Sequence, residues 1–571
     1  MKNLLLKNNC RAIIIFLLSI NNLFAQANKN VFNEKPAGFD YFIGIVGNPS
    51  APNIDWSDKQ LIELKQLGVN MLQLSIAWGG KPADEVLNLE DLDEEQKAKF
   101  KYRIKQAKKF GFKTIAHFGI PRMLNYAPIL PACIMDEDIK KKYVDLISDF
   151  MISFPEVDDI LVYTYDQQAW ICSEFGPCPR CSGLPLDERL PGFLNLLNNT
   201  IQKYRPNGSR LWWKPWEISK GQTIAILEKL NTKGLGLMLN PSTTNEVYPF
   251  NDRSFKSDLG VKRFVTLART RNIPVIGEFD HTLYKPLYQI GDYFPRLVYE
   301  TLNGWKELNI QGIKEYYGFE SSNFSVNYEM LKAWVKSPEE SLEYLLNKIA
   351  APYGEKRSGF MKEAWELVAQ SVEAFPWDVT YLIGPMGLDL SQNGTHSWQP
   401  ANIPNATWDT PIWEANRRAN FMLTDSNKAH PWIFEDAGLR LEDAAKLGFL
   451  AVEFFDKAIA ENGIKIEEIK EQRAIVNKTS KSLRGVSIHY LLTLASQDAR
   501  MAQINDDQFQ LIVKRIDKLL VRDLENGNKE AEKKLIEFRQ NPKQWLQFSF
   551  NPRTHESISY PDWKVWTVPQ D

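Results

Sequence analysis

The chain has 571 residues, of which 44% are hydrophobic, and it carries 69 Lys and Arg against 71 Asp and Glu, for a formal net charge of −2. A nearly neutral chain without a block of basic residues is not suited to binding nucleic acid, so we exclude that class of partner. The length exceeds that of one ordinary domain, and two structural units are expected.

Residues 1–25 have the pattern of a secretory signal peptide. A basic start precedes a short apolar core at 12–18, and small residues follow it up to Ala25. This order is typical of a cleavable export signal. No later run reaches the roughly 20 apolar residues that a membrane-spanning helix needs. We therefore expect a periplasmic or secreted protein without a membrane span; the sequence leaves the oligomeric state open.

Eight short apolar runs, each followed by a helix-like stretch, occupy the next part of the chain. The runs are 41–46, 71–78, 113–118, 160–165, 209–213, 236–239, 273–277 and 313–317. Strands that alternate with helices predict parallel strands joined by crossover helices. Eight such units close a (β/α)8 TIM barrel, an α/β fold whose chemistry lies at the C-terminal ends of its strands. We place this barrel at residues 38–352.

The helices between these runs follow from apolar residues at helical spacing. They are expected at 57–67, 94–110, 138–152, 187–204, 222–230, 259–270 and 293–308, with the eighth inside 328–350. Asp136 or Asp138 is the predicted cap of the third helix.

A mainly α-helical domain is expected at residues 353–571. Helical spacing of apolar residues predicts helices at 356–373, 439–461, 467–499 and 506–527. Between the first two lies an irregular segment, 375–416, which is rich in Trp, Pro and Gly. It is too aromatic for a flexible linker, and we predict that it folds over the barrel mouth. The alternative is that its rings only pack the helices against the side of the barrel.

Carboxylates gather at the ends of the fourth and seventh runs. Asp166 and Glu174 follow the fourth run, and Glu278 and Asp280 close the seventh. Because side chains alternate along a strand, Glu278 and Asp280 share one face. Glycosidic hydrolysis uses two carboxyl groups, one protonated and one ionised. We predict Glu174 or Asp166 as the acid and Glu278 as the base or nucleophile, with Asp280 beside it.

Other polar and aromatic residues at strand ends are predicted to bind substrate. They are Trp78, Arg122, Trp213, Lys214, Glu246, His281, Glu315 and Tyr316. Rings around Lys214 would suit a sugar that carries a carboxylate, through stacking and a point charge. The alternative for each acid is a helix cap or an ion pair, and for each Trp it is packing against a crossover helix.

Four cysteines remain after the signal: Cys133, Cys172, Cys178 and Cys181. The main interpretation is one or two disulfides that pin the loop after the fourth strand in an oxidising compartment. A four-thiolate zinc site is one alternative, because Cys178 and Cys181 have the Cys-x-x-Cys spacing of zinc ligands. Free thiols are the other alternative.

No phosphate-binding Gly-rich loop, His-Glu-x-x-His motif or nucleophile elbow occurs in the chain. The six histidines are scattered singly. We therefore predict an active site without a cofactor and without a histidine-bound metal.

The order of motifs resembles the α-glucuronidases of glycoside hydrolase family 67, which have a (β/α)8 barrel followed by a large helical domain. Ser173-Glu-Phe-Gly-Pro177, followed by a helix and by Trp212-Trp-Lys, is similar to the segment with that family's general acid. Ile276-Gly-Glu278-Phe, with Gly304-Trp-Lys-Glu307 downstream, is similar to the strand with its base.

Past the barrel, Gly384-Pro-Met-Gly-Leu388 and Trp408-Asp-Thr-Pro-Ile-Trp413 resemble the same family's segment beside the substrate. The resemblance implies that this stretch forms one wall of the pocket, with Trp398 and Trp408 as contacts.

The chain also departs from family 67. The first strand follows the signal almost directly, where the family has an accessory domain, and no Asp follows the sixth strand at 239–246. Lys214 stands where the family has an Arg. The prediction is an exported glycosidase of an oligosaccharide or polysaccharide, with a uronic-acid-containing glycan as one substrate class. The alternatives are a hexosaminidase-like glycosidase and a non-catalytic carbohydrate-binding protein.

Overall fold

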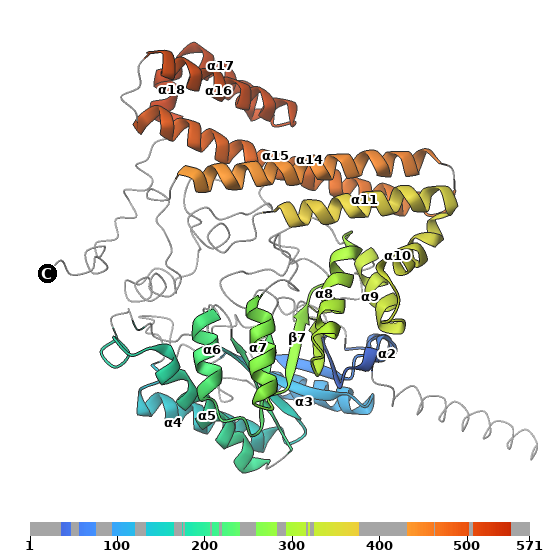
Figure 1. Ribbon diagram of the computed structural model, residues 1–571, viewed down its shortest axis with the longest axis vertical. Coiled ribbons are helices and arrows are strands. Elements are labelled where there is room, and N and C mark those ends of the chain that lie inside the picture. The colour runs from blue at the N-terminus through green and yellow to red at the C-terminus, as the bar shows by residue number, and fades with distance from the viewer. Residues whose placement is uncertain are drawn as a thin grey trace, which may run out of the picture.

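The computed structural model describes residues 36–46, 56–75, 94–119, 133–164, 174, 178–205, 208–215, 220–239, 259–281, 293–315, 318–319, 325–375, 431–461, 463–501 and 506–549. Its parallel strands form a closed barrel in the order β1-β2-β3-β4-β5-β6-β7-β8 (Figure 1). The predicted (β/α)8 barrel followed by a helical region is confirmed.

The eight strands all overlap the predicted runs. They are β1 (Tyr41–Ile45), β2 (Met71–Ser75), β3 (Lys113–Gly119), β4 (Asp159–Thr164), β5 (Leu211–Pro215), β6 (Leu235–Leu239), β7 (Val275–Phe279) and β8 (Gly312–Glu315). A 3-10 turn, η1 (Pro36–Gly38), precedes the first strand.

The crossover helices lie where helical spacing predicts them. They are α2 (Asp58–Leu67), α3 (Glu94–Lys109), α4 (Glu137–Ser153), α5 (Leu186–Tyr204), α6 (Lys220–Lys229), α7 (Leu259–Thr270) and α8 (Pro295–Glu307). The predicted eighth helix is two helices, α9 (Val326–Lys336) and α10 (Leu342–Ala350), because Ser341 caps a new helix. Asp136 is the cap of α4: its Oδ1 accepts from Asp138 N at 3.0 Å.

Side chains of alternate strand residues fill the barrel. One apolar layer closes its interior with a side chain from each of seven strands: Ile43, Met71, Ile115, Leu161, Trp212, Met238 and Ile276. The intervening residues face outward and join the helices in a second, larger core, which contains Trp213 and Phe279. The period of two along each strand therefore decides which residues can reach the barrel mouth.

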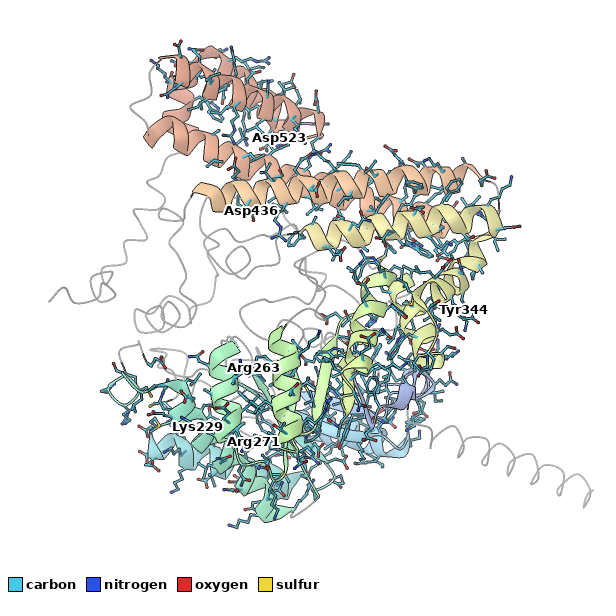
Figure 2. All side chains as sticks on the ribbon, in the orientation of Figure 1. Lys229, Arg263, Arg271, Tyr344, Asp436 and Asp523 are labelled. Atoms are coloured by element: carbon cyan, nitrogen blue, oxygen red, sulfur yellow. The ribbon has the colours of Figure 1, made fainter. Side chains whose placement is uncertain are left out.

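The helices are tied to each other as well as to the sheet. Arg271, directly after α7, donates from Nη2 to the carbonyl of Leu230 at the end of α6 at 2.7 Å. Figure 2 labels Arg271 together with Lys229 of α6 on this side of the barrel. Such side-chain bonds satisfy carbonyls at the helix end that have no partner inside the helix.

Gly277 of β7 makes room for a ring of the outer core. A Cβ placed on Gly277 would lie 2.2 Å from Cδ2 of Trp305, which is fully buried on α8. Trp305 in turn donates from Nε1 to the carbonyl of Glu278 at 2.8 Å. The small residue thus lets α8 pack directly on the strand that carries the predicted catalytic carboxylates.

We expect Gly277→Ala to lower the free energy of unfolding by about 1–3 kcal/mol, because overpacking forces the ring or the strand to move. Gly192→Ala is the matched control: Gly192 is exposed on α5 and a Cβ there has no atom within 4 Å. The control should be neutral or stabilising by up to about 1 kcal/mol. Urea unfolding measures both, and equal stability of the two variants would contradict this account.

The helical region begins with η4 (Ala351–Tyr353) and α11 (Glu355–Ala374). Its longer helices are α14 (Pro431–Ala460) and α15 (Ile466–Met501), which lie beside α11 in one layer (Figure 1). A second group contains α16 (Asp506–Glu525), α17 (Glu530–Gln540) and α18 (Pro542–Ser549), which share a small core with the C-terminal part of α15. The last two are short helices that the sequence pattern did not predict.

An ion-pair cluster joins this region to the barrel. Arg296 of α8 lies 2.8 Å from Glu366 and 2.7 Å from Glu373, both on α11. Within the layer, Ser371 Oγ of α11 donates to the carbonyl of Ala444 of α14 at 2.7 Å. Among the helices that the structure describes, none is long and apolar enough to cross a membrane.

Candidate active site

A polar layer lies directly above the apolar layer of the barrel interior. Glu278 is two residues beyond Ile276 on β7, Lys214 two beyond Trp212 on β5, and Lys314 two beyond Gly312 on β8. The period of two turns all three side chains into the barrel. Each of the three side chains is 0% exposed.

Both oxygens of Glu278 are held by lysines. Lys314 Nζ lies 2.9 Å from Oε1, and Lys214 forms an ion pair with Oε2. Burial, the largest single effect, would raise the pKa of Glu278, but the two ammonium groups together outweigh it. The pKa of Glu278 is therefore lowered, and the carboxylate stays ionised in a fully buried site.

Asp280, two residues after Glu278, lies on the same inward face and nearer the mouth of the barrel. It is 2% exposed, and among the described residues its Oδ1 has no hydrogen-bond partner. Burial raises the pKa of Asp280 well above its ordinary value, and the nearby carboxylates of Glu315 and Glu278 raise it further. Asp280 is therefore a buried carboxyl group that holds its proton more tightly than the neighbouring Glu278 does.

His281 and Glu315 form a supporting pair on the outward side. His281 Nδ1 and Glu315 Oε1 are 3.0 Å apart, and the backbone N–H of Gly318 donates to the other oxygen of Glu315. Asn327 of α9 donates to the carbonyl of His281 at 2.9 Å. The imidazole also stacks on Phe319, with ring centres 5.1 Å apart. These contacts fix the chain directly after Asp280 in place.

Glu174 is bound to the start of α5. Its Oε2 accepts from the backbone N–H of Leu186 at 3.0 Å, and its carbonyl accepts from Gly183 N at 2.8 Å. Carboxylates stabilise helix N-termini by accepting from free N–H groups there. The geometry thus favours the capping alternative for Glu174 over the predicted role as acid.

We expect Glu174→Ala to lower the free energy of unfolding by about 1 kcal/mol, with equal small effects on substrates with good and poor leaving groups. Glu174→Gln separates the role of cap from the role of acid. Its amide oxygen can still accept from Leu186 N, but the side chain has no acidic proton to donate. If Glu174 is only a helix cap, this variant should have near-normal turnover. A selective loss on poor leaving groups would restore Glu174 as the acid.

Two predicted binding residues have other partners. Trp213 is fully buried in the core between strands and helices, so it faces away from the interior, contrary to the prediction that it stacks on a sugar. Its neighbour Trp212 faces inward but lies in the apolar layer, where Nε1 donates to Asp159 Oδ2 at 2.8 Å. Lys214 faces inward as expected, but its ammonium is paired with Glu278 rather than free for a substrate carboxylate.

Lys314 is a site residue that the sequence analysis missed. It is the direct register partner of Glu278 on the neighbouring strand. A charged residue in the middle of the apolar run at 313–317 was a usable signal, since a buried Lys in a barrel strand needs a partner.

Seven predicted residues lie outside the part of the chain that the structure describes: Trp78, Arg122, Asp166, Glu246, Tyr316, Trp398 and Trp408. The same holds for the signal peptide and for Cys172. Their predicted roles stay predictions.

The three described cysteines meet near the starts of α4 and α5. Cys133 Sγ lies 3.5 Å from Cys181 Sγ and 3.7 Å from Cys178 Sγ. Among the described residues no disulfide joins any two of these three cysteines. The predicted pairings that involve Cys172 stay predictions.

No protein-family model matches the chain, and no curated protein matches its sequence. Among solved structures the chain is similar to a GH138 enzyme targeting pectin rhamnogalacturonan II, with 11% identity and a TM-score of 0.52. The match covers 86% of this chain but 62% of the GH138 enzyme.

Two other similar structures are also sugar-cleaving enzymes. A mutant of the O-GlcNAc hydrolase of Thermobaculum terrenum has 12% identity and a TM-score of 0.37, with 86% of this chain and 97% of that chain covered. A glycoside hydrolase family 5 enzyme of Prevotella bryantii has 13% identity and a TM-score of 0.36, covering 55% and 96%. At 11% identity the likeness to the GH138 enzyme shows the fold alone. The relation to family 67 stays a prediction.

Proposed function

We propose that the chain is a glycoside hydrolase whose acid is Asp280 and whose ionised partner is Glu278. The observation that carries this proposal is the opposite tuning of two carboxyl groups on one face of β7. The pKa of Glu278 is lowered and the pKa of Asp280 is raised. Pairs whose environments push their pKa values apart mark acid and base assignments.

The chemistry of glycosidic cleavage fits this pair. Asp280 would hold a proton at neutral pH and deliver it to the leaving oxygen. Glu278 would act as base or nucleophile, with the two lysines keeping it ionised. Both groups lie at the C-terminal end of a barrel strand, where such folds place their chemistry. Asp166 remains the alternative acid from the sequence.

The substrate is proposed to be a polysaccharide or oligosaccharide met outside the cytoplasm, in keeping with the signal-like residues 1–25. The similar GH138 enzyme is described as targeting a pectin, so pectic fragments are the first substrates to test. We retain a uronic-acid unit as part of the proposed substrate. The ammonium group of Lys214 does not support this choice, because it is paired with Glu278.

A second candidate is a non-catalytic carbohydrate-binding protein. Both oxygens of Glu278 are engaged and its side chain is 0% exposed, which suits a structural ion cluster as well as a reactive group. In this case Glu278 would stabilise the barrel and sugar would bind above it.

A substrate panel separates the two candidates. Purified protein is incubated with pectic, xylan and glucan polysaccharides and with aryl glycosides, and released reducing ends are measured beside binding by calorimetry. The enzyme proposal predicts turnover of at least one glycan, which Asp280→Asn lowers. Binding without turnover across the panel would favour the second candidate.

A further inference from the structure

Three thiols from two separate loops converge at one point beside the barrel mouth. Cys133 lies just before α4, and Cys178 and Cys181 lie just before α5. Their sulfur atoms all lie within 4.8 Å of one another. Cys181 is 0% and Cys133 8% exposed, while Cys178 is partly exposed.

The sulfur separations match the edges of a metal-thiolate tetrahedron. With Zn–S bonds of about 2.3 Å, two sulfurs on one zinc lie about 3.8 Å apart. The two separations from Cys133, 3.5 and 3.7 Å, are near this value. A disulfide would engage only two of the three thiols, whereas a metal ion would engage all three.

The backbone holds the Cys178-Pro-Arg-Cys181 turn in a fixed shape. The N–H groups of Cys181 and Ser182 both donate to the carbonyl of Cys178, at 3.1 and 2.9 Å. Arg180, on the outside of this turn, lies 2.8 Å from Asp136 Oδ2, and Asp136 caps α4. An independent ion pair therefore braces the turn against the segment that carries Cys133.

We propose that Cys133, Cys178 and Cys181 supply three of the four ligands of a tetrahedral zinc ion that holds the two loops together, with a solvent molecule in the fourth position. Each thiol would release its proton to solvent and bind as thiolate. A set of sulfur ligands favours zinc or another soft divalent ion and disfavours Mg²⁺ and Ca²⁺, which prefer oxygen. The ion would tie the loop after β3 to the loop after β4, and so hold Glu174 at the start of α5. This site is independent of the proposed glycosidase activity.

The first test is the metal content of the full-length protein. Protein reconstituted with Zn²⁺ under reducing conditions and then desalted should contain about one zinc per chain by mass spectrometry of the metal. Substitution by Co²⁺ should give the intense visible bands of tetrahedral thiolate coordination. A chelator should lower the melting temperature, and added Zn²⁺ should restore it.

Cys181→Ser tests the buried ligand, with Ser182→Ala as the control at the next, exposed position. The first variant loses a coordinating thiolate, so its zinc affinity should fall by more than the roughly tenfold that loss of a supporting partner costs, and the control should bind like the wild type. If Cys181→Ser does not fold, the zinc content and cobalt spectrum of the wild type still decide. Wild-type protein that binds no zinc after reconstitution would overturn the proposal. So would a disulfide from Cys133 to Cys178 or Cys181 in freshly isolated, unreduced protein.

Discussion

Glu278→Gln is expected to abolish turnover and also to destabilise the barrel by about 3–5 kcal/mol, because it leaves two buried ammonium groups without their counter-charge. Lys214 and Lys314 both contact this one carboxylate, and all three side chains are 0% exposed. The sequence alone predicts that the same change keeps the fold, since Gln has the volume of Glu. The ion cluster is the reason for the revised expectation.

A second variant separates the loss of chemistry from the loss of stability. Glu278→Gln combined with Lys314→Met removes one of the two orphaned charges and should recover part of the lost stability, but no turnover. Urea unfolding and reducing-sugar release measure the two effects. Full recovery of turnover in the double variant would show that Glu278 only balances the lysines.

The stability from Glu278 also has a predicted pH dependence. Its folded-state pKa is lowered from 4.5, so its contribution is fully present above that value and is lost as pH falls through the lower folded pKa. Acid unfolding of the wild type should include this loss below about pH 4.5, and the Gln variant should lack it.

Asp280→Asn is expected to lower turnover by about 10²–10⁴-fold on substrates with poor leaving groups, and less on activated aryl glycosides. The amide keeps the shape of the side chain but has no acidic proton to deliver. The activity ratio between the two substrate types is the measurement that checks this.

The same change should stabilise the fold at neutral pH. The pKa of Asp280 is raised well above 3.8, so its stability contribution is complete below that value and is lost as pH rises through the folded pKa. The Asn variant should therefore become more stable than the wild type as pH rises from about 3.8 to the folded-state pKa. The difference in the free energy of unfolding should grow by up to about 1.4 kcal/mol per pH unit, with no difference near pH 3. Such a gain in stability with a loss of function is common where an active site holds a strained group.

Urea unfolding at a series of pH values provides the test. Asp145→Asn, at an exposed position on α4, is the matched control and should leave the curve unchanged. Parallel curves for wild type and Asp280→Asn would contradict the assignment of a raised pKa to Asp280, and with it the proposed acid.

The sequence alone determined the barrel and the strand that carries the candidate site. Eight apolar runs of strand length, separated by helix-length stretches, left few arrangements other than a closed parallel barrel. The period of two also placed Glu278 and Asp280 on one face of β7. These predictions rest on local patterns, and a local pattern involves neighbouring residues only.

Only the tertiary structure decided what these residues contact. Lys214 and Lys314 lie 100 residues apart in the chain, and barrel closure alone brings both to Glu278. Alternation did not reveal which of Trp212 and Trp213 faces the interior, because both are buried against apolar surface. The sequence predicted Glu174 as a candidate acid, and only the position of Leu186 N favours a cap instead. Charge pairing, facing and pKa depend on what lies within a few ångströms in space, and that depends on how distant segments meet.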